Sequence, residues 1–313
     1  MRFGALDLYA GFGRVVWGRL DELQPTDVIN PLDVSRFFFE GRNQARLPVA
    51  VARVRYYFTD EVTLEGVYVP VFRRGRFDQL DEDSSPFNVA PSIPLPVEQR
   101  DPSTRWGSAQ GGIRFAATTG RFDWSMSAYR GFEPFPFARF SADGSTIVSI
   151  HPRFTMIGGD FEAVRGDWGL RGEGAAFVRD NFQGTDLSVS DGHSFDTGLG
   201  VDRRAGGYQL TGTVLFHRED PAGPDSGFFS ARNDLSIILS ADRTFVRERY
   251  RTRAFTVYNP SEGSAFLRFI GMATLRDDLA LEASGGWFPG DGRDTIGRFS
   301  DSDFVYARLR CYW

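Results

Sequence analysis

The segment Asp303–Trp313, DFVYARLRCYW, alternates apolar and polar side chains and ends in an aromatic residue. In an extended chain, successive side chains point to opposite faces. One face of this segment is mainly apolar and carries Val305, Ala307, Leu309, Cys311 and Trp313. The other face carries Phe304, Tyr306, Arg308, Arg310 and Tyr312. This period of two predicts a β-strand. Because soluble sandwiches also end in such strands, the rest of the chain has to decide the class of sheet.

Composition fits a sheet that crosses a membrane. The chain has 313 residues, 41% of them hydrophobic, and a mean hydropathy of −0.30. Its apolar runs are far shorter than the about 20 residues that a membrane-spanning helix needs. A barrel strand needs only about 9–11 residues and alternates lipid-facing with lumen-facing side chains, so its average hydropathy stays low. Aromatic residues reach 15%, including 30 Phe, which suits interfacial girdles.

Several function classes are disfavoured. The net charge is −5 and the 36 basic residues, all Arg, are dispersed, so nucleic acid is not an expected partner. A single cysteine excludes an internal disulfide and a cysteine-based metal cluster. The three histidines stand far apart, and no H-E-x-x-H, G-x-S-x-G or nucleotide-binding glycine pattern occurs. We therefore expect no enzyme activity, no metal site and no cofactor.

Fourteen alternating segments follow one another along the chain, and most are 10–13 residues long. They span residues 5–17, 49–58, 62–72, 106–118, 121–131, 153–164, 168–179, 194–203, 207–217, 234–242, 246–258, 264–275, 279–288 and 303–313. Short and long connections alternate between them, with one exception at 259–263. Short turns on one rim and long loops on the other are typical of outer-membrane barrels. The pattern predicts an all-β, transmembrane, antiparallel up-and-down β-barrel of about 14 strands, forming one domain over residues 1–313, with both termini on the short-turn, periplasmic side.

Individual strands predict which face meets lipid. In 207–217 we expect an outward set of Tyr208, Leu210, Gly212, Val214 and Phe216. The inward set of the same strand is then Gln209, Thr211, Thr213 and His217. Near the short-turn ends an aromatic girdle is expected from Trp124, Trp168, Tyr208 and Trp313. The segment 62–72 is ambiguous, because its second half is apolar on both faces.

Two resemblances point the same way. The last strand resembles the assembly signal of Gram-negative outer-membrane barrels, carried here by Leu309, Tyr312 and Trp313. Near the other end, the segments GRVVWG (13–18), INPLD (29–33) and LPV (47–49) resemble a family of uncharacterised, porin-like outer-membrane proteins with G-R-x-x-x-W-G, I-N-P-x-D and L-P-V. The likeness covers residues 6–70, with one residue fewer between Arg14 and Trp17.

The family resemblance implies a signal peptide and further strands ahead of the matching segment. The start of this chain, MRFGALDLYAGFGRVVWG, lacks the charged and apolar regions of a signal peptide. Either the chain is a mature form or an N-terminally truncated part of a larger barrel, or it is not exported. The expected location is the bacterial outer membrane. The expected partners are outer-membrane lipid, lipopolysaccharide, the barrel-assembly machinery and a small solute, with the oligomeric state left open.

The long loop 18–48 carries its own apolar cluster. Asn30 and Pro31 open a turn, Asp33 or Ser35 can cap a short helix, and Phe37, Phe38 and Phe39 can bury it. A loop of this length is too long to be idle in a compact domain. We expect it either to fold into the lumen as a constriction, with Asn30, Pro31, Asp33, Phe37 and Phe38 as its key residues, or to pack on the rim.

Arginines recur at inward positions. The most distinctive row is Arg247, Arg249, Arg251 and Arg253, four residues expected on one face of one strand. Guanidinium groups at the bilayer midplane cost about 2–4 kcal/mol each, so this face is expected to line the lumen. The full set of expected pore-lining residues is Arg53, Arg55, Arg114, Arg171, Arg249, Arg251, Arg253, Arg268, Arg308 and Arg310. Such a lumen favours anions; alternatively, these arginines pair with carboxylates and brace the wall.

The function expected from these observations is passive diffusion of small polar or anionic solutes through an Arg-lined channel. Two alternatives stay open. One is a barrel that transports a hydrophobic substrate or exports a polymer, since Phe255, Val257 and Phe304 are apolar inward residues. The other is a non-conducting adhesin or structural barrel whose loops bind a partner.

Overall fold

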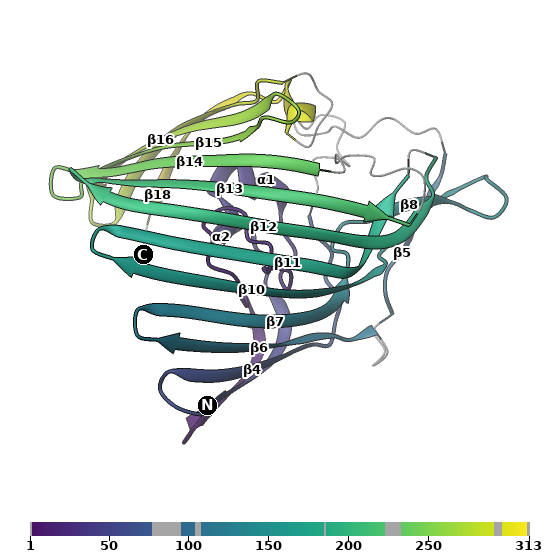
Figure 1. Ribbon diagram of the computed structural model, residues 1–313. Helices are drawn as coiled ribbons and strands as arrows, with labels where there is room; N and C mark the ends of the chain where they lie inside the picture. Colours follow the sequence, from purple (N-terminus) through teal and green to yellow (C-terminus); the bar gives the residue numbers. More distant parts are fainter. Residues whose placement is uncertain are drawn as a thin grey trace.

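The computed structural model describes residues 2–76, 95–103, 108–184, 186–222, 233–290 and 296–311. Over these residues the chain is almost entirely β-structure, and the expected all-β class is confirmed (Figure 1). The strands of the main sheet are β1 (Arg2–Phe3), β2 (Leu6–Gly13), β3 (Val49–Tyr57), β4 (Val62–Val69), β6 (Gln110–Thr119), β7 (Phe122–Phe132), β10 (Arg153–Arg165), β11 (Trp168–Gln183), β12 (Val189–Ala205), β13 (Tyr208–Pro221), β14 (Asn233–Phe245), β15 (Tyr250–Asn259), β16 (Ser264–Arg276), β17 (Leu279–Trp287) and β18 (Phe304–Cys311).

Each strand of this sheet pairs antiparallel with the next one along the chain. The order runs from β1 through β4, then β6, β7 and β10, and on without interruption to β18. Apart from the two-residue β1, these are the fourteen strands predicted from alternation. The start of β1 and the end of β18 lie at the end of the sheet where the short turns gather (Figure 1). Among the described residues no pairing joins β18 to β1 or β2, so the strand order has two ends.

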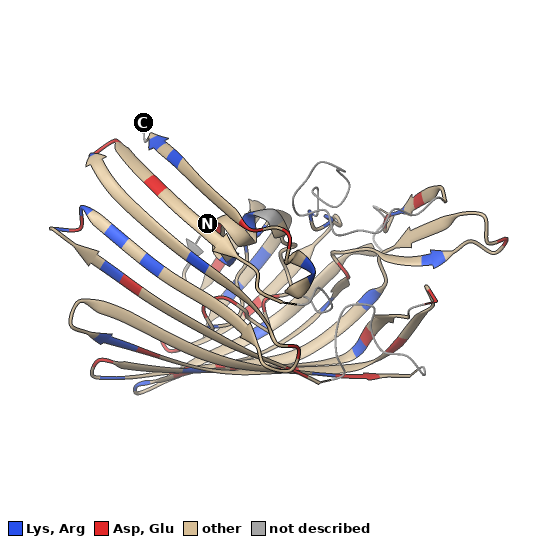
Figure 2. Ribbon diagram, turned by 90° about the horizontal axis from the view of Figure 1, so that it is seen from above, with Lys and Arg blue, Asp and Glu red and all other residues tan. Residues whose placement is uncertain are grey.

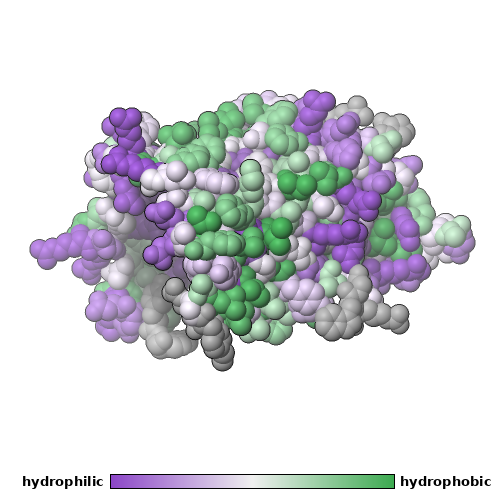
Figure 3. Space-filling model, turned by 60° about the horizontal axis from the view of Figure 1, so that its bottom comes forward, coloured by the Kyte–Doolittle hydropathy of each residue, from purple (hydrophilic) through white to green (hydrophobic). Residues whose placement is uncertain are grey.

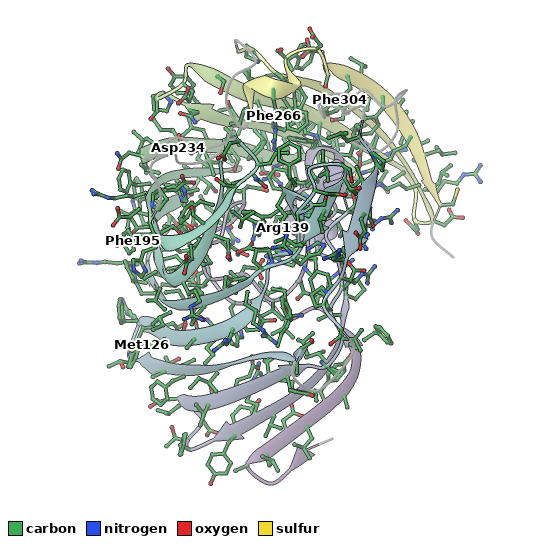
Figure 4. The ribbon with its side chains drawn as sticks, turned by 90° about the vertical axis from the view of Figure 1, so that its right-hand side faces the viewer. Met126, Arg139, Phe195, Asp234, Phe266 and Phe304 are labelled. Carbon is green, nitrogen blue, oxygen red and sulfur yellow. The ribbon has the colours of Figure 1, made fainter. Side chains whose placement is uncertain are left out.

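Alternation along the strands gives the sheet two unlike faces. In β13, Tyr208, Leu210 and Val214 are 41–47% exposed, whereas Thr213 between them is 4% exposed. The large exposed apolar residues fall mainly on this outward face, and Figure 3 shows green side chains across its middle with purple ones toward both ends. Met126 and Phe195 point away from the enclosed side, whereas Phe266 points into it (Figure 4). The outward set predicted for 207–217 is therefore the outward set of β13.

Tight turns close the short-turn rim. Gly120, Gly166, Gly206 and Gly207 have positive φ there, which glycine adopts without a steric penalty. The turn between β14 and β15 differs, because Val246, Arg247 and Glu248 have positive φ without being glycine. The prediction that four arginines lie in one row of a strand is wrong at its first half. Arg247 and Arg249 belong to this turn, and β15 begins at Tyr250.

A small second sheet forms at the long-loop rim, where only loops were expected. It contains β5 (Val97–Arg100), β8 (Phe137–Phe140) and β9 (Ile147–Ile150), in the order β5-β9-β8. Strand β9 pairs parallel with β5 and antiparallel with β8. This arrangement brings together segments that the sequence pattern treated as separate loops.

The segment 14–48, called the insert below, leaves β2 and crosses the enclosed side of the sheet before β3 begins. It contains the short helices α1 (Val34–Glu40) and α2 (Arg42–Ala45), which lie behind the strands in Figure 1. None of the described helices is long and apolar enough to cross a membrane. The insert completes two apolar clusters: Trp17 packs with Val67, Val69 and Tyr129, and Phe38 packs with Phe266, Phe288 and Phe299. Val67 and Val69 are thus apolar on the inner face because the insert covers them.

Candidate functional site

The base of the insert is held by one side chain. Asn30 accepts a hydrogen bond from the backbone N–H of Val15 (2.7 Å) and donates one to the carbonyl of Leu47 (2.7 Å). Pro31 contributes its carbonyl, which accepts from the N–H of Leu47 at 2.8 Å. The two ends of the insert are thereby tied together beside the start of β3. Of the two candidate caps of α1, Asp33 accepts from the N–H of Arg36, and the structure describes nothing of the Ser35 side chain.

Glu173 of β11 anchors the first part of the insert through hydrogen bonds. Its carboxylate accepts hydrogen bonds from the N–H groups of Arg19 (2.9 Å), Leu20 (3.2 Å) and Thr26 (2.7 Å), and from the Thr26 hydroxyl (2.8 Å). Gly18 has φ +95°, and a Cβ at that position would lie 2.5 Å from a Glu173 oxygen. Only glycine gives this turn both its backbone conformation and its close approach to the carboxylate.

Beside Glu173 the inner face is rich in acids. Asp160 binds Arg19 at 2.7 Å and Arg114 at 2.9 Å, and its side chain is fully buried. Arg171 binds three carboxylates, from Asp21, Glu162 and Asp202, at 2.9–3.1 Å. We call this group the acidic half; its members are Arg19, Arg114, Arg171, Asp21, Asp123, Asp160, Glu162, Glu173 and Asp202. Six carboxylates face three guanidiniums here. Burial and the neighbouring Glu22 and Asp202 raise the pKa of Asp21, although the Arg171 charge opposes this.

A cavity of about 490 Å³ lies between the insert and strands β15–β18. Its charged lining contains six arginines and three glutamates: Arg36, Arg251, Arg253, Arg268, Arg308, Arg310, Glu22, Glu40 and Glu282. Aromatic side chains complete the wall: Phe37, Phe39, Phe255 and Phe266. We call this the basic cavity. Blue segments accordingly gather on the strands that lead to the C-terminus in Figure 2.

Carboxylates hold the arginines of the basic cavity in place. Asp242 of β14 binds Arg251 at 2.8 Å and approaches Arg253 at 3.5 Å, and Arg253 also binds Glu22 of the insert. Glu282 of β17 binds Arg308 at 2.8 Å and Arg310 at 2.7 Å. With Asp242 included, the local charge is six positive against four negative. The cavity therefore keeps a positive excess although five of its six arginines pair with carboxylates.

Residues of β16 and β18 bind helix α1 at the bottom of the cavity. Arg268 is 5% exposed and donates hydrogen bonds to the Ser284 hydroxyl (3.1 Å) and the Tyr306 hydroxyl (2.9 Å), and also to the Phe39 carbonyl. Arg308 binds Glu40 of α1 at 2.9 Å. Burial alone would raise the pKa of Glu40, but the hydrogen bond from Arg308 and the charges of Arg36 and Arg308 outweigh it, and the pKa lies below its ordinary value. Glu40 is thus a carboxylate that fastens α1 to β18.

The other expected pore-lining residues lie outside the basic cavity. Arg53 and Arg55 both pair with Glu65, at 3.9 and 2.5 Å, and Glu65 also accepts from the indole N–H of Trp17. Arg249 donates to the backbone carbonyl of Thr274 from its place in the turn. Its expected place in the strand wall is therefore corrected, because the four-residue turn takes up Val246–Arg249.

The expected assembly-signal residues are only partly described. Leu309 faces outward and is 58% exposed, whereas Tyr312 and Trp313 lie outside the described residues. Among the expected constriction residues, Phe37 lines the basic cavity and Phe38 is 8% exposed within its aromatic cluster. The structure thus places Asn30, Pro31, Asp33, Phe37 and Phe38 together on the enclosed side of the sheet.

The sequence pattern did not indicate the contacts by which the insert binds the wall. Arg19, Glu22, Glu40 and Glu173 carry these contacts, whose partners stand 141–268 residues away along the chain. A signal was present only at Trp17 and Gly18, which belong to the GRVVWG segment. A second cavity of about 300 Å³ beside the insert contains His217, which contacts Asp196 at 2.6 Å.

Comparison with known proteins shows likeness at the level of the sheet. No family model matches the sequence, and no curated protein matches it. The structure is similar to OmpT (in-vitro folded), an outer membrane protein of Vibrio cholerae, with 13% identity and a TM-score of 0.41 over 85% of this chain and 89% of that one. It is also similar to the high pH structure of Pseudomonas putida OprB, with 8% identity and a TM-score of 0.44 over 85% of this chain and 72% of that one.

Proposed function

We propose that the chain forms the wall of an outer-membrane channel through which small organic anions diffuse. The observation that carries the proposal is the basic cavity, where six arginines face three glutamates on the enclosed side of a sheet whose outward face is mainly apolar. Arginine rows of this kind attract anions and repel cations in pores. Their carboxylate partners hold the guanidiniums in fixed positions and leave the positive excess in place.

The membrane setting follows from the two faces of the sheet. Large apolar side chains cover the outward face, and charged side chains gather on the enclosed face. Hydrocarbon tolerates no unpaired backbone donors or acceptors, so the outer edge of β18, and that of β2 beyond its short pairing with β1, each need a strand partner in a bilayer. Val305 and Phe12, in these two strands, are the most exposed large apolar side chains of the described residues, at 80% and 77%.

The insert sets the width and the chemistry of the passage. It packs across the enclosed face from Trp17 to Phe38 and brings Arg36, Phe37 and Phe39 to the basic cavity. Charged and aromatic side chains thus line the cavity together. This combination suits an anion with an apolar part better than a bare inorganic ion, because the apolar part loses water contact against Phe37 and Phe255.

The test is the ion preference of the protein reconstituted in planar bilayers. Wild-type protein is expected to show a reversal potential of the sign for anion preference under a potassium chloride gradient. The double variant Arg251→Glu, Arg253→Glu places two negative charges in the cavity and is expected to invert that sign.

A matched control is available on the same β-hairpin. Arg247→Glu with Arg249→Glu changes the same number of charges in the turn outside the cavity, and it is expected to keep the wild-type sign. Unaltered preference in the cavity variant, or equal effects of the two double variants, would refute an arginine-governed passage. Absence of any conductance by the wild-type protein would refute the channel itself.

A further inference from the structure

Three arginines stand on the outward face, next to the short turns. Arg165 of β10, Arg203 of β12 and Arg243 of β14 are exposed. Register places Arg165 opposite Trp168, Trp168 opposite Arg203, and Tyr208 opposite Arg243. Trp168 and Tyr208 are 50% and 41% exposed. Arginines and aromatic rings therefore alternate along this rim of the wall.

Two of the guanidiniums lie over the rings. The guanidinium carbon of Arg203 is 4.7 Å from the centre of the Trp168 ring, and that of Arg243 is 4.6 Å from the centre of the Tyr208 ring. Arg243 also donates a hydrogen bond to the Tyr208 hydroxyl at 2.8 Å. Stacking on a ring orders the guanidinium and leaves most of its N–H donors free for a planar, bidentate partner.

These arginines differ from those of the enclosed face in having no carboxylate partner among the described residues. Five strands, β10 to β14, form this part of the rim. In the parts of these strands nearest the short turns, no acidic residue occupies an outward position, and the only charged outward residues there are Arg165, Arg203 and Arg243. The stretches concerned are Thr155–Arg165, Trp168–Ala176, Phe195–Ala205, Tyr208–Phe216 and Leu235–Arg243. Among the described residues these three arginines thus form no ion pair at the border of the apolar face.

We propose that Arg165, Arg203 and Arg243, with Trp168 and Tyr208, bind the phosphate groups of anionic phospholipids in the leaflet that the short turns face. In outer-membrane barrels this is the periplasmic leaflet. Neighbouring strands lie about 4.8 Å apart, so the backbones of the strands that carry successive arginines are about 10 Å from one another. Arginine pairs with phosphate through two parallel hydrogen bonds, and the adjoining rings lie at the level of the headgroups. This lipid site is separate from the channel and does not depend on conduction.

The experiment measures lipid retained by the purified, detergent-solubilised protein in native mass spectrometry. Phosphatidylglycerol and phosphatidylcholine serve as anionic and zwitterionic probes, and lipid A serves as the probe for the opposite leaflet. Wild-type protein is expected to retain phosphatidylglycerol at least about threefold better than phosphatidylcholine, a modest preference for charge-assisted contacts at an exposed surface. The variant Arg203→Gln, Arg243→Gln is expected to lose that preference.

Arg204→Gln provides the matched control, because Arg204 is the exposed neighbour of Arg203 on the opposite face of β12. It is expected to keep the wild-type preference, and heat-dependent gel mobility shows whether each variant is folded. A folded double variant with the wild-type preference would overturn the proposal. So would a wild-type protein that retains both phospholipids equally, or a double variant that loses lipid A while it keeps phosphatidylglycerol.

Discussion

The acidic half and the basic cavity occupy the same enclosed face, yet they use charge in opposite ways. In the acidic half, six carboxylates surround three guanidiniums, and their main partners are backbone N–H groups and side chains of the insert. In the basic cavity, six arginines line open space and four carboxylates hold them. The first arrangement anchors the insert, and the second leaves an excess of two positive charges beside the cavity. The function of a row of like charges can thus be inferred only when the residues that pair with those charges are also known.

The largest effect is expected where the acidic half anchors the insert, at Glu173. The variant Glu173→Ala leaves three backbone N–H groups and the Thr26 hydroxyl without their acceptor. Hydrogen bonds to a charged group contribute about 1.5–3 kcal/mol each, so a loss of more than about 3 kcal/mol in the free energy of opening the insert is expected. Hydrogen–deuterium exchange of residues 15–30 measures this loss.

Glu162→Ala is the control for that prediction, because Glu162 is one-quarter exposed and its partners among the described residues are the side chains of Arg19 and Arg171, with no backbone N–H of the insert. It is expected to change exchange in residues 15–30 far less. Equal exchange in the two variants would mean that the insert is not anchored at Glu173.

A second test concerns Glu133, which follows β7 at the long-loop rim above the acidic half. Burial, and then the charge of Asp180, raise the pKa of Glu133 to about 8, against a weak opposing hydrogen bond from Asn181. A carboxyl whose folded pKa is raised favours the closed structure below its unfolded pKa, and this contribution is lost as pH rises through 8. The opening constant of this rim is expected to rise by up to about tenfold per pH unit between about pH 5 and pH 8.

Hydrogen exchange in residues 133–151 at several pH values, corrected for the intrinsic exchange rate, reads this opening. Glu133→Gln is expected to make the opening constant insensitive to pH over the same range. The same pH dependence in wild type and variant would assign it to another group.

The variant Asp242→Asn tests how the net charge of the basic cavity affects ion preference. This change removes one negative charge that binds Arg251 and Arg253 but leaves both arginines beside the cavity. Anion-over-cation permeability is expected to rise about twofold, corresponding to ~0.5 kcal/mol for a partly exposed charge. Reversal potentials in asymmetric potassium chloride measure it. A fall in anion preference would show that Asp242 contributes position rather than charge.

The smallest effect is expected at Arg36, on the exposed side of α1. Arg36 pairs with Glu40 one helical turn away, and its side chain is 45% exposed. Arg36→Gln is expected to change the stability by at most about 0.5 kcal/mol, since exposed pairs at this spacing contribute little. Thermal or denaturant unfolding checks this, and a much larger loss would mean that α1 depends on Arg36 rather than on Phe38 and Glu40.

The sheet could be predicted from the sequence because its signal is local. A period of two recurs within each strand, and the short turns between strands are marked by Gly120, Gly166 and Gly206. The turn at Val246–Arg249 was missed because its positive φ residues are not glycine, so the arginine row was extended two residues too far. The small sheet of β5, β8 and β9 was missed because its strands are four residues long and come from separate loops.

The candidate site could be predicted only in part. Alternation predicted inward positions for Arg251, Arg253, Arg268, Arg308 and Arg310, and in the structure these five residues line one cavity. Two of their partners could not be predicted, because Glu22 and Glu40 reach them from the insert, more than 200 residues away in sequence. The charge excess of a site depends on such distant pairs, whereas the orientation of a strand residue depends on its neighbours alone.

The proposed function requires that the outward face of the sheet contacts lipid and that the enclosed face contacts water. Leu239 and Ser240 are neighbours in β14; Leu239 is 51% exposed on the outward face, and Ser240 faces the enclosed side. Spin labels at these two positions, in a Cys311→Ser background reconstituted in bilayers, report access of oxygen from lipid and of a nickel chelate from water. The account predicts high oxygen access and low nickel access at 239, and the reverse at 240. Equal access of the nickel chelate to both positions would contradict it.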